Sequence, residues 1–141
     1  MTRIDVESIL HLKMTFVKFE ETNKRQEDRI TVTGHSSFGF PTKFYNDNKI
    51  GEYKYVTLFF NEENNEVGFY FHSDEAEKHK FSILKSKQSY GGSIVASSFF
   101  KSKNLDSKTY RGRYEWRKEN ISEITEIFVI KLKIRENPDV G

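Results

Sequence analysis

The sequence predicts a mainly β protein with short helices, an α+β fold in which two related strand-loop-helix-strand-strand units close into one small barrel. First, Phe, Tyr and Trp supply 15% of the 141 residues, and these residue types suit pleated sheets. Second, several segments alternate apolar and polar residues with the period of a half-buried strand. Third, the order of aromatic residues in the stretch 43–71 returns in a stretch that begins at Ser98. One copy alone has too little apolar surface to close a core, so two copies sharing one barrel would explain their place in one chain.

Residues 1–28 are expected to form an extension that precedes the repeated units. The segment DVESILHL is compatible with a short helix capped by Asp5, and Thr15–Glu20 alternates like a strand. A polar loop, ETNKRQED, follows it. The added strand could pair with the barrel or with a second chain, and the sequence leaves both open.

The first unit covers residues 29–75. Arg29–Thr33 (RITVT) is rich in β-branched residues and predicts a strand, and the glycines of GHSSFGF predict an irregular loop after it. Pro41 suits the first turn of a short helix, which Gly51 would end. The segments YKYVTLFF and VGFYF then predict two strands joined by a hairpin turn, NEENNE.

The second unit covers residues 76–141 and repeats this order, so residues 29–141 are expected to form one compact domain. Phe44 and Ile50 align with Phe99 and Leu105 at a constant offset of 55 residues. Around this second helix, the segments KFSIL, YRGRYEW and IFVI predict strands. RKENISEITE predicts a turn between the last two, and KSKQSYGGS predicts a loop longer than its counterpart. Short patterns are ambiguous, but the shared order of elements is harder to produce by chance.

Composition indicates a soluble protein. The mean hydropathy is −0.72, and 31% of the residues are charged. No apolar run approaches the roughly 18 residues of a membrane span, and Met1–Lys13 lacks the apolar core of a signal peptide. We therefore expect a cytoplasmic protein without a membrane partner. The absence of cysteine excludes disulfides, thiolate metal ligands and a cysteine nucleophile.

The sequence shows no catalytic signature, and we predict no catalytic residue, no metal site and no cofactor. His72 and His79 lie seven residues apart in a predicted loop, which is not a spacing typical of metal ligands. His35 stands beside Ser36, but a nucleophile and its base need to meet in space, and adjacency in sequence is no evidence of that.

Charge is distributed unevenly along the chain. The segment Lys78–Lys118 holds 11 Lys and Arg against two acidic residues, a net charge of +9, so the rest carries −7 within the total of +2. Nucleic-acid binding needs cations that replace phosphate counterions, glycines that let the backbone approach, and aromatic rings that stack on bases. The second unit supplies all three, with Arg111 and Arg113 expected on one face of a strand and Tyr114 and Trp116 turned toward the core. The predicted nucleic-acid-binding residues are Lys80, Lys85, Lys87, Tyr90, Lys101, Lys103, Lys108, Arg111 and Arg113.

These observations favour a nucleic-acid-binding protein, with DNA expected over RNA, that serves as a transcriptional regulator. A solvated face that keeps the protein soluble would explain the same charge pattern. A second alternative is a protein-interaction module or antitoxin-like partner whose acidic and basic halves dock on different surfaces or form a homo-oligomer. An enzyme acting on a nucleotide or nucleic acid would need a well-formed pocket, which a sequence does not show.

Pro41, Ile50 and Gly51, followed by Tyr55–Phe60, carry a resemblance to a known family. The run ITVTGHSSFGFPTKFYNDNKIGEYKYVTLFFNEENNEVGFYF resembles the AbrB-like swapped-hairpin unit: a strand and loop, a short helix after a proline, a glycine break and two strands. Proteins of the MraZ type place two such units in one chain. The resemblance, which covers residues 29–132 when both units count, implies that two units intertwine into a barrel and bind DNA as a transcription regulator.

The chain also departs from the family pattern. The family usually carries arginines on its DNA-contacting strand and loop, just before a G-x-[IV]-x-[IL]-P run. At that position the first unit offers Arg29 and His35, and the proline becomes Ala96 in the second unit. In the second unit the cations at this place are Lys80, Lys85 and Lys87. These departures concern the mode of DNA binding more than the fold.

Overall fold

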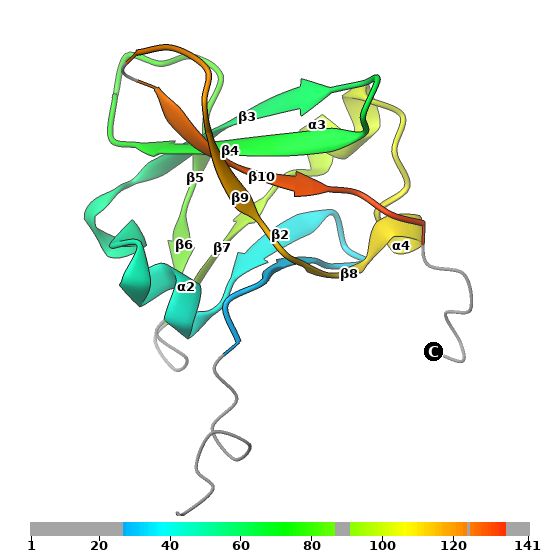
Figure 1. The fold of residues 1–141 in the computed structure, drawn as a ribbon, viewed down its shortest axis with the longest axis horizontal. Coiled ribbons are helices and arrows are strands. Elements are labelled where there is room, and N and C mark those ends of the chain that lie inside the picture. Colours follow the sequence, from blue (N-terminus) through cyan, green and yellow to red (C-terminus); the bar gives the residue numbers. More distant parts are fainter. Residues whose placement is uncertain (1–26, 87–90, 124, 135–141) are drawn as a thin grey trace, which may run out of the picture.

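The fold consists of two antiparallel β-sheets that enclose a shared core (Figure 1). The computed structural model describes residues 27–86, 91–123 and 125–134. Within these ranges there are ten strands, three short α-helices and one 3₁₀-helix. The prediction of a mainly β protein with short helices is therefore confirmed.

Sheet A has the strand order β6-β7-β2-β1-β8. Its central pair is β2 with β7, in which Phe38 lies opposite Ile94, and β1 and β6 flank this pair on its two sides. The strands of sheet A are β1 (Ile30–Val32), β2 (Ser37–Phe40), β6 (Leu84–Lys85), β7 (Gly92–Val95) and β8 (Gly112–Tyr114).

Sheet B has the strand order β5-β3-β4-β10-β9. Its central pair is β4 with β10, in which Phe69 lies opposite Phe128, and β3 and β9 flank this pair. The strands of sheet B are β3 (Tyr55–Asn61), β4 (Glu66–His72), β5 (Phe81–Ser82), β9 (Arg117–Asn120) and β10 (Glu126–Lys131).

The chain passes from one sheet to the other at both edges. Only Ile83 separates β5 of sheet B from β6 of sheet A, and two residues separate β8 of sheet A from β9 of sheet B. The hydrogen-bonded ladders stay within each sheet, so closure into a single barrel is not confirmed. Each sheet contains strands from residues 29–75 and from residues 76–141, so neither predicted unit builds a sheet alone.

The helices are α2 (Thr42–Asp47), the 3₁₀-helix η1 (Ile50–Glu52), α3 (Ser97–Ser102) and α4 (Ser107–Tyr110). The backbone N–H of Tyr45 donates to the carbonyl oxygen of Pro41 at 2.8 Å, and that of Phe100 donates to Ala96 at 3.1 Å. These bonds begin α2 and α3 at positions 55 residues apart. In the described ranges, no helix has the length and apolar character needed to cross a membrane.

The helices α2 and α3 are both followed by a residue in the left-handed conformation. Lys49 has φ of 54° and Asn104 has φ of 57°, again at corresponding positions. A glycine was expected to end the first helix, but Gly51 lies inside η1 and Lys49 makes the turn. Pro41 was expected in the first turn and instead precedes it as the N-cap, with an extended backbone.

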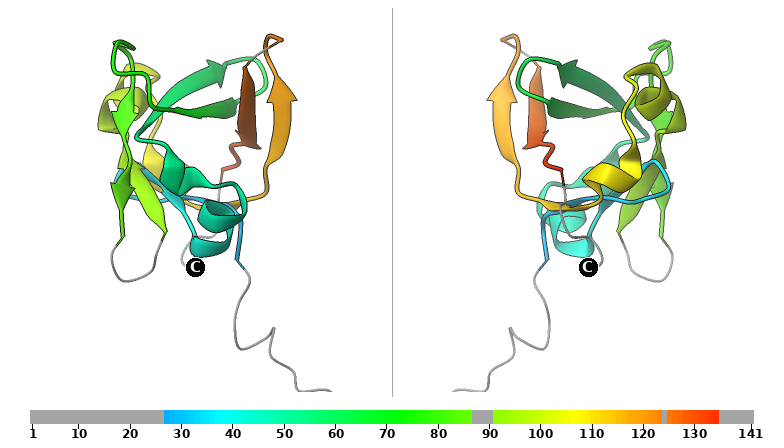
Figure 2. Two further views of the ribbon diagram at one scale, coloured as in Figure 1. Left: turned by 90° about the vertical axis from the view of Figure 1, so that its left-hand side faces the viewer. Right: turned by 90° about the vertical axis from the view of Figure 1, so that its right-hand side faces the viewer.

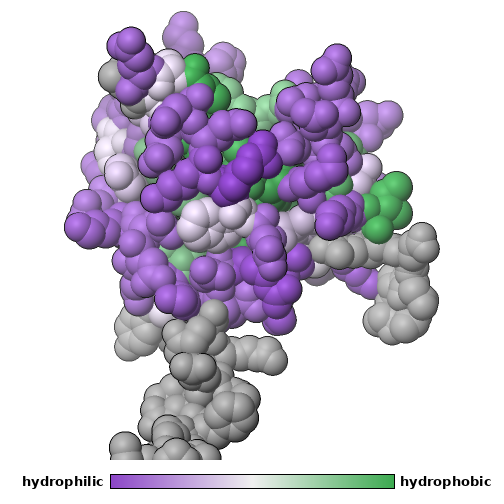
Figure 3. Space-filling view, viewed as in Figure 1, coloured by the Kyte–Doolittle hydropathy of each residue, from purple (hydrophilic) through white to green (hydrophobic). Residues whose placement is uncertain are grey.

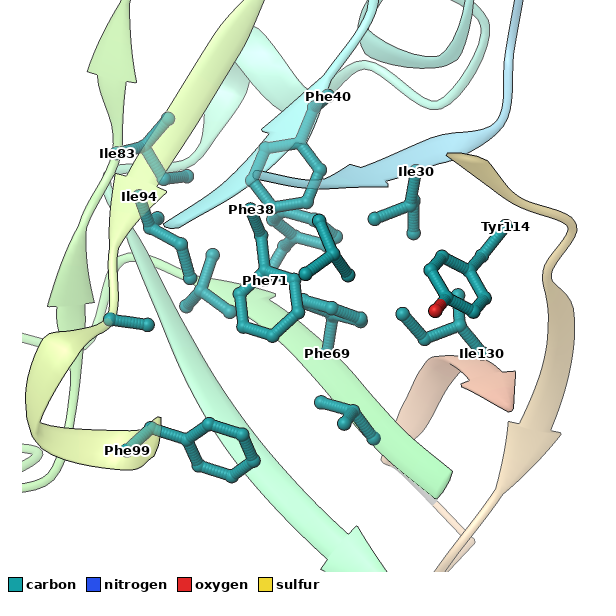
Figure 4. Packing of buried hydrophobic residues seen from close by; sticks show 14 of the residues in the cluster. Ile30, Phe38, Phe40, Phe69, Phe71, Ile83, Ile94, Phe99, Tyr114 and Ile130 are labelled. Atoms are coloured by element: carbon teal, nitrogen blue, oxygen red, sulfur yellow. The ribbon is translucent and has the colours of Figure 1, made fainter. Parts of the chain in front are cut away.

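Aromatic side chains from both sheets fill the core (Figure 4). The rings of Phe38 and Phe69 meet edge to face at 4.9 Å between centroids, and those of Phe40 and Phe71 meet at 5.1 Å. Each of these pairs joins β2 of sheet A to β4 of sheet B. Because burying a Phe side chain contributes about 1.5–3 kcal/mol, these contacts hold the sheets face to face.

Three strands lie where the sequence predicted loops or a turn. β9 (Arg117–Asn120) lies in the predicted turn RKENISEITE. β2 occupies the second half of GHSSFGF, and β7 begins within KSKQSYGGS. The predicted strand KFSIL is divided between β5 and β6, which belong to different sheets. The helix at Asp5 and the strand Thr15–Glu20 fall outside the described residues.

Candidate nucleic-acid interface

The predicted basic residues do not form one continuous patch. Lys87 and Tyr90 fall outside the described residues. The Lys80 ammonium donates to the carbonyl oxygens of Glu75 at 3.1 Å and Glu77 at 2.6 Å, and it lies 4.8 Å from the centre of the Tyr55 ring. Lys80 therefore ties a loop to sheet B.

Lys85 is also separate from the other cations. It lies on β6, and its ammonium donates to the carbonyl oxygen of Gly51 at 2.9 Å. This contact fastens the edge of sheet A to η1, next to the end of α2. Lys85 is thus placed at the helix of the first unit, and not at the helices of the second.

The remaining cations gather around α3 and α4. Lys101 and Lys103 lie at the end of α3, Lys108 lies in α4, and Arg111 follows α4 directly. All four side chains are exposed. Figure 2 (right) shows α3, α4, the β1–β2 turn and the C-terminal end of β10 on one side of the molecule. We call this region the α3–α4 surface, defined by His35, Lys101, Lys103, Lys108, Arg111 and Lys133.

Hydroxyl groups fix the β1–β2 turn against α4. The backbone N–H of Ser36 donates to the Ser107 hydroxyl at 3.0 Å, and the two serine hydroxyls lie 3.2 Å apart. The carbonyl oxygen of Ser36 accepts from the N–H of Ala96 at 2.9 Å. In α4, the Asp106 carboxylate accepts from the backbone N–H of Lys108 at 3.0 Å, which caps the helix. The turn and the helix are therefore held in one arrangement.

Two cationic side chains lie across this turn. The Cγ of Lys108 and the Cδ of Arg111 are 3.6 and 3.9 Å from the place where a side chain on Gly34 would begin. His35, the next residue, is exposed at the tip of the same turn. The aliphatic parts of the two side chains thus pack on the turn, and both residues are exposed as a whole.

Lys133 joins the same surface from the other end of the chain. The hydroxyl of Tyr114 donates to the carbonyl oxygen of Tyr110 at the end of α4, and it contacts the backbone of Lys133. This network holds Lys133 beside α4. Lys133 was not predicted from the sequence, because its position follows from the pairing of strands far apart in the chain and no local pattern marks it.

Arg113 has a different environment from Arg111. The prediction that Arg111 and Arg113 share one strand is wrong, because Arg111 is the C-cap of α4 and precedes β8. Arg113 lies on β8, with Nη1 3.8 Å from Oε1 of Glu27. Glu27 also accepts two hydrogen bonds from the Arg29 guanidinium, at 2.9 and 3.0 Å. The Arg29 hydrogen bonds, with Arg113 nearby, lower the pKa of Glu27 to about 2.

The aromatic residues beside these arginines face inward, as predicted. Tyr114 is only 4% exposed. The Trp116 ring packs on Phe44 and Phe128, and its N–H donates to the carbonyl oxygen of Asp28 at 2.8 Å. These rings stabilise the core, so among the described residues they offer no stacking platform for bases on the α3–α4 surface.

His72 has a structural environment. It is the last residue of β4, not a loop residue as predicted, and it is buried. Its Nδ1 accepts from the backbone N–H of Asp74 at 3.0 Å, which leaves Nε2 to donate to the Thr57 hydroxyl at 2.9 Å. That hydroxyl donates to the carbonyl oxygen of His79 at 3.0 Å. Both ring nitrogens are thus committed to holding the end of β4.

Comparison with known proteins assigns no family. The chain matches no protein-family model, no curated protein and no solved structure. The resemblance to the AbrB-like unit therefore stays a hypothesis.

Proposed function

We propose that the protein binds nucleic acid, DNA in preference to RNA, through the α3–α4 surface. The observation that carries this proposal is the gathering of exposed cations around two short helices and the β1–β2 turn. The ammonium groups of Lys101, Lys108 and Lys133 make no ion pair with any carboxylate in the described parts of the chain. Cations without a protein partner are available to replace counterions along a phosphate backbone.

The geometry favours contacts to phosphates over contacts to bases. The cations are exposed, whereas Tyr114 and Trp116 are turned inward. Proteins that bind single strands use exposed aromatic rings for stacking, so a surface of lysine and arginine suits a duplex better. Binding of this kind depends on salt and only weakly on sequence.

We also propose that residues 29–75 and 76–141 are two copies of one unit, and that the two sheets together form one barrel. The matching helices and the central pairs β2 with β7 and β4 with β10 support this idea, because each centre joins corresponding strands of the two units. In the AbrB-like family such units bind DNA to regulate transcription, and a transcriptional regulator is the role we propose.

The test is fluorescence-anisotropy binding to a short duplex DNA and to RNA over a range of salt concentrations. We expect the double variant Lys101→Ala, Lys108→Ala to reduce the salt slope of log Kd by about 2 and to weaken binding about tenfold at moderate salt. Both side chains are exposed and form no ion pair within the described ranges, so the variant should fold normally.

The matched control removes two positive charges elsewhere. Lys43→Ala with Lys54→Ala changes the net charge equally, but Lys43 pairs with Asp47 at 2.6 Å and Lys54 with Glu75 at 3.4 Å. Neither residue lies on α3 or α4. Equal effects of the two double variants would assign binding to overall charge, and absence of binding at low salt would overturn the proposal.

A further inference from the structure

A cavity of about 590 Å³ opens between the end of α2 and the strands β4, β9 and β10 of sheet B. In Figure 1, α2 lies at the lower left, whereas α3 and α4 lie at the right. The cavity is therefore separate from the α3–α4 surface. The face of the molecule seen in Figure 3 has mainly hydrophilic side chains. We call it the α2–β10 pocket, lined among others by Lys49, Tyr53, Phe71, Lys118, Glu126 and Phe128.

Aromatic rings form one side of this pocket. The Phe71 ring lies 6.4 Å from that of Tyr53 and 5.6 Å from that of Phe128, centroid to centroid. Tyr53 and Phe128 are half-buried, so part of each side chain stays accessible. Three adjoining rings at the wall of a cavity are suited to contact with a flat, apolar ring system.

Two lysines supply positive charge at the same place. The Lys118 ammonium lies 5.5 Å from the centre of the Phe128 ring, and Lys49 occupies the exposed left-handed turn after α2. Neither ammonium pairs with a carboxylate in the described residues. Of the lining carboxylates, Asp47 already pairs with Lys43, so Glu126 is the acidic group that remains.

We propose that the α2–β10 pocket binds a nucleoside phosphate. The base would lie against the aromatic rings, and the phosphate would contact Lys118 and Lys49. The Glu126 carboxylate would accept hydrogen bonds from ribose hydroxyls or an exocyclic amine. The volume falls within the range of small-molecule sites, which is roughly 300–1,000 Å³. A cationic ligand is disfavoured because it would meet the charges of two lysines.

The nucleoside phosphate could be a free nucleotide or the phosphorylated end of a nucleic-acid strand, since both present the same chemistry. The inference goes beyond the proposed function, because neither lysine belongs to the α3–α4 surface. A variant of a pocket lysine that loses nucleotide binding and still binds duplex DNA therefore separates the two proposals.

Isothermal titration calorimetry provides the test, with adenosine monophosphate, adenosine, and a trinucleotide with and without a 5′-phosphate as probes. We expect adenosine monophosphate to bind about tenfold more tightly than adenosine, because one charge-assisted contact is worth about that factor. Lys118→Gln should remove most of this difference and leave duplex DNA binding unchanged. The control Lys54→Gln removes a lysine charge that pairs with Glu75, and neither of these residues lines the pocket, so this variant should change neither.

The outcomes are decisive for the pocket and for the source of the ligand. Binding of the mononucleotide points to a free nucleotide as the ligand. Binding of the phosphorylated trinucleotide alone points to the end of a nucleic-acid strand. Either result supports the pocket if Lys118→Gln weakens the binding. Absence of binding by every phosphorylated probe, or binding unaffected by Lys118→Gln and by Lys49→Gln, overturns the proposal.

Discussion

Residues 41–50 and residues 96–105 follow the same backbone path and present different surfaces. Each begins with one helical hydrogen bond from the fourth residue of the helix and ends at a left-handed residue, Lys49 or Asn104. At corresponding buried positions stand Phe44 and Phe99. At a corresponding exposed position, the first helix has Asn46 where the second has Lys101. The buried aromatic residues therefore determine the backbone path of each helix. Exposed positions can carry charge without destabilising the fold.

The chain also leaves the two helices differently. After α2 it makes η1 and enters β3, whereas after α3 it makes a second helix, α4, and then the short strand β8. The additional helix brings Lys108 and Arg111 to the β1–β2 turn. The first helix thus ends beside the α2–β10 pocket, and the second helix ends beside the cations of the α3–α4 surface.

The largest expected effect tests whether the two buried rings are equivalent. Phe44 is fully buried against Phe40, Phe71, Trp116 and Phe128, with ring centroids 5.1 to 6.1 Å apart. Replacing it with Ala should lower the free energy of unfolding by about 4 kcal/mol, because the change leaves a cavity lined by other rings. Urea unfolding followed by circular dichroism measures this value.

Phe99→Ala is the comparison variant. Phe99 is 8% exposed and contacts three rings, those of Phe38, Phe60 and Phe100. Its loss should therefore cost less, about 3 kcal/mol. Phe59→Ala, at a side chain that is 39% exposed, should cost less than about 1 kcal/mol. A cost for Phe99→Ala above that for Phe44→Ala would contradict this ranking of the two units.

A smaller effect tests the charge that joins the units. Glu27 contacts Arg29 beside β1 and Arg113 on β8, and these contacts lower its pKa from 4.5 to about 2. A lowered pKa means that the contribution to stability is complete above the unfolded value and is lost as the pH falls toward the folded value. Both arginines are about half exposed, so solvent screening limits the contribution to about 1 kcal/mol.

The measurement is urea unfolding at pH 6 and pH 3 for the natural chain and for Glu27→Gln. From pH 6 to pH 3, the free energy of unfolding of the natural chain should fall by about 1 kcal/mol more than that of the variant. Over this interval the Glu27 carboxylate takes up a proton mainly in the unfolded state, and the variant lacks this carboxylate. Glu66→Gln is the comparison variant, since Glu66 also has a lowered pKa and also joins the units, through Arg117 of β9 within sheet B. If the natural chain and Glu27→Gln had the same pH dependence, Glu27 would not contribute to the stability of the contact between the units.

The sequence predicted the elements that have strong local patterns. The hairpin of β3 and β4 and the two helices at an offset of 55 residues follow from alternating aromatic residues and from repeated Phe positions. The strands β2 and β7 were missed because each has only four residues and contains a glycine, which is depleted in strands. Their pairing with each other, Phe38 opposite Ile94, depends on the other unit and leaves no local signal.

The candidate sites were predictable only in part. The excess of positive charge in the second unit is visible in the sequence, but Lys80 and Lys85 are used for backbone contacts away from α3. Lys133 and the β1–β2 turn join the α3–α4 surface through contacts between distant parts of the chain. The α2–β10 pocket likewise combines residues from both units, so no single segment marks it.

The smallest expected effect concerns the left-handed residues that end the two helices. Lys49 has a side chain that disfavours φ of 54°, whereas asparagine tolerates the φ of 57° found at Asn104. Lys49→Gly should therefore raise the free energy of unfolding by about 0.5–1 kcal/mol, and Asn104→Gly should change it by less than about 0.3 kcal/mol. Lys101→Gly, within α3, should lower stability by about 0.5–1 kcal/mol, because glycine is unfavourable in a helix. Thermal unfolding of the three variants measures the differences. A loss of stability in Lys49→Gly would show that the two helix ends, although alike in backbone, are not held in the same way.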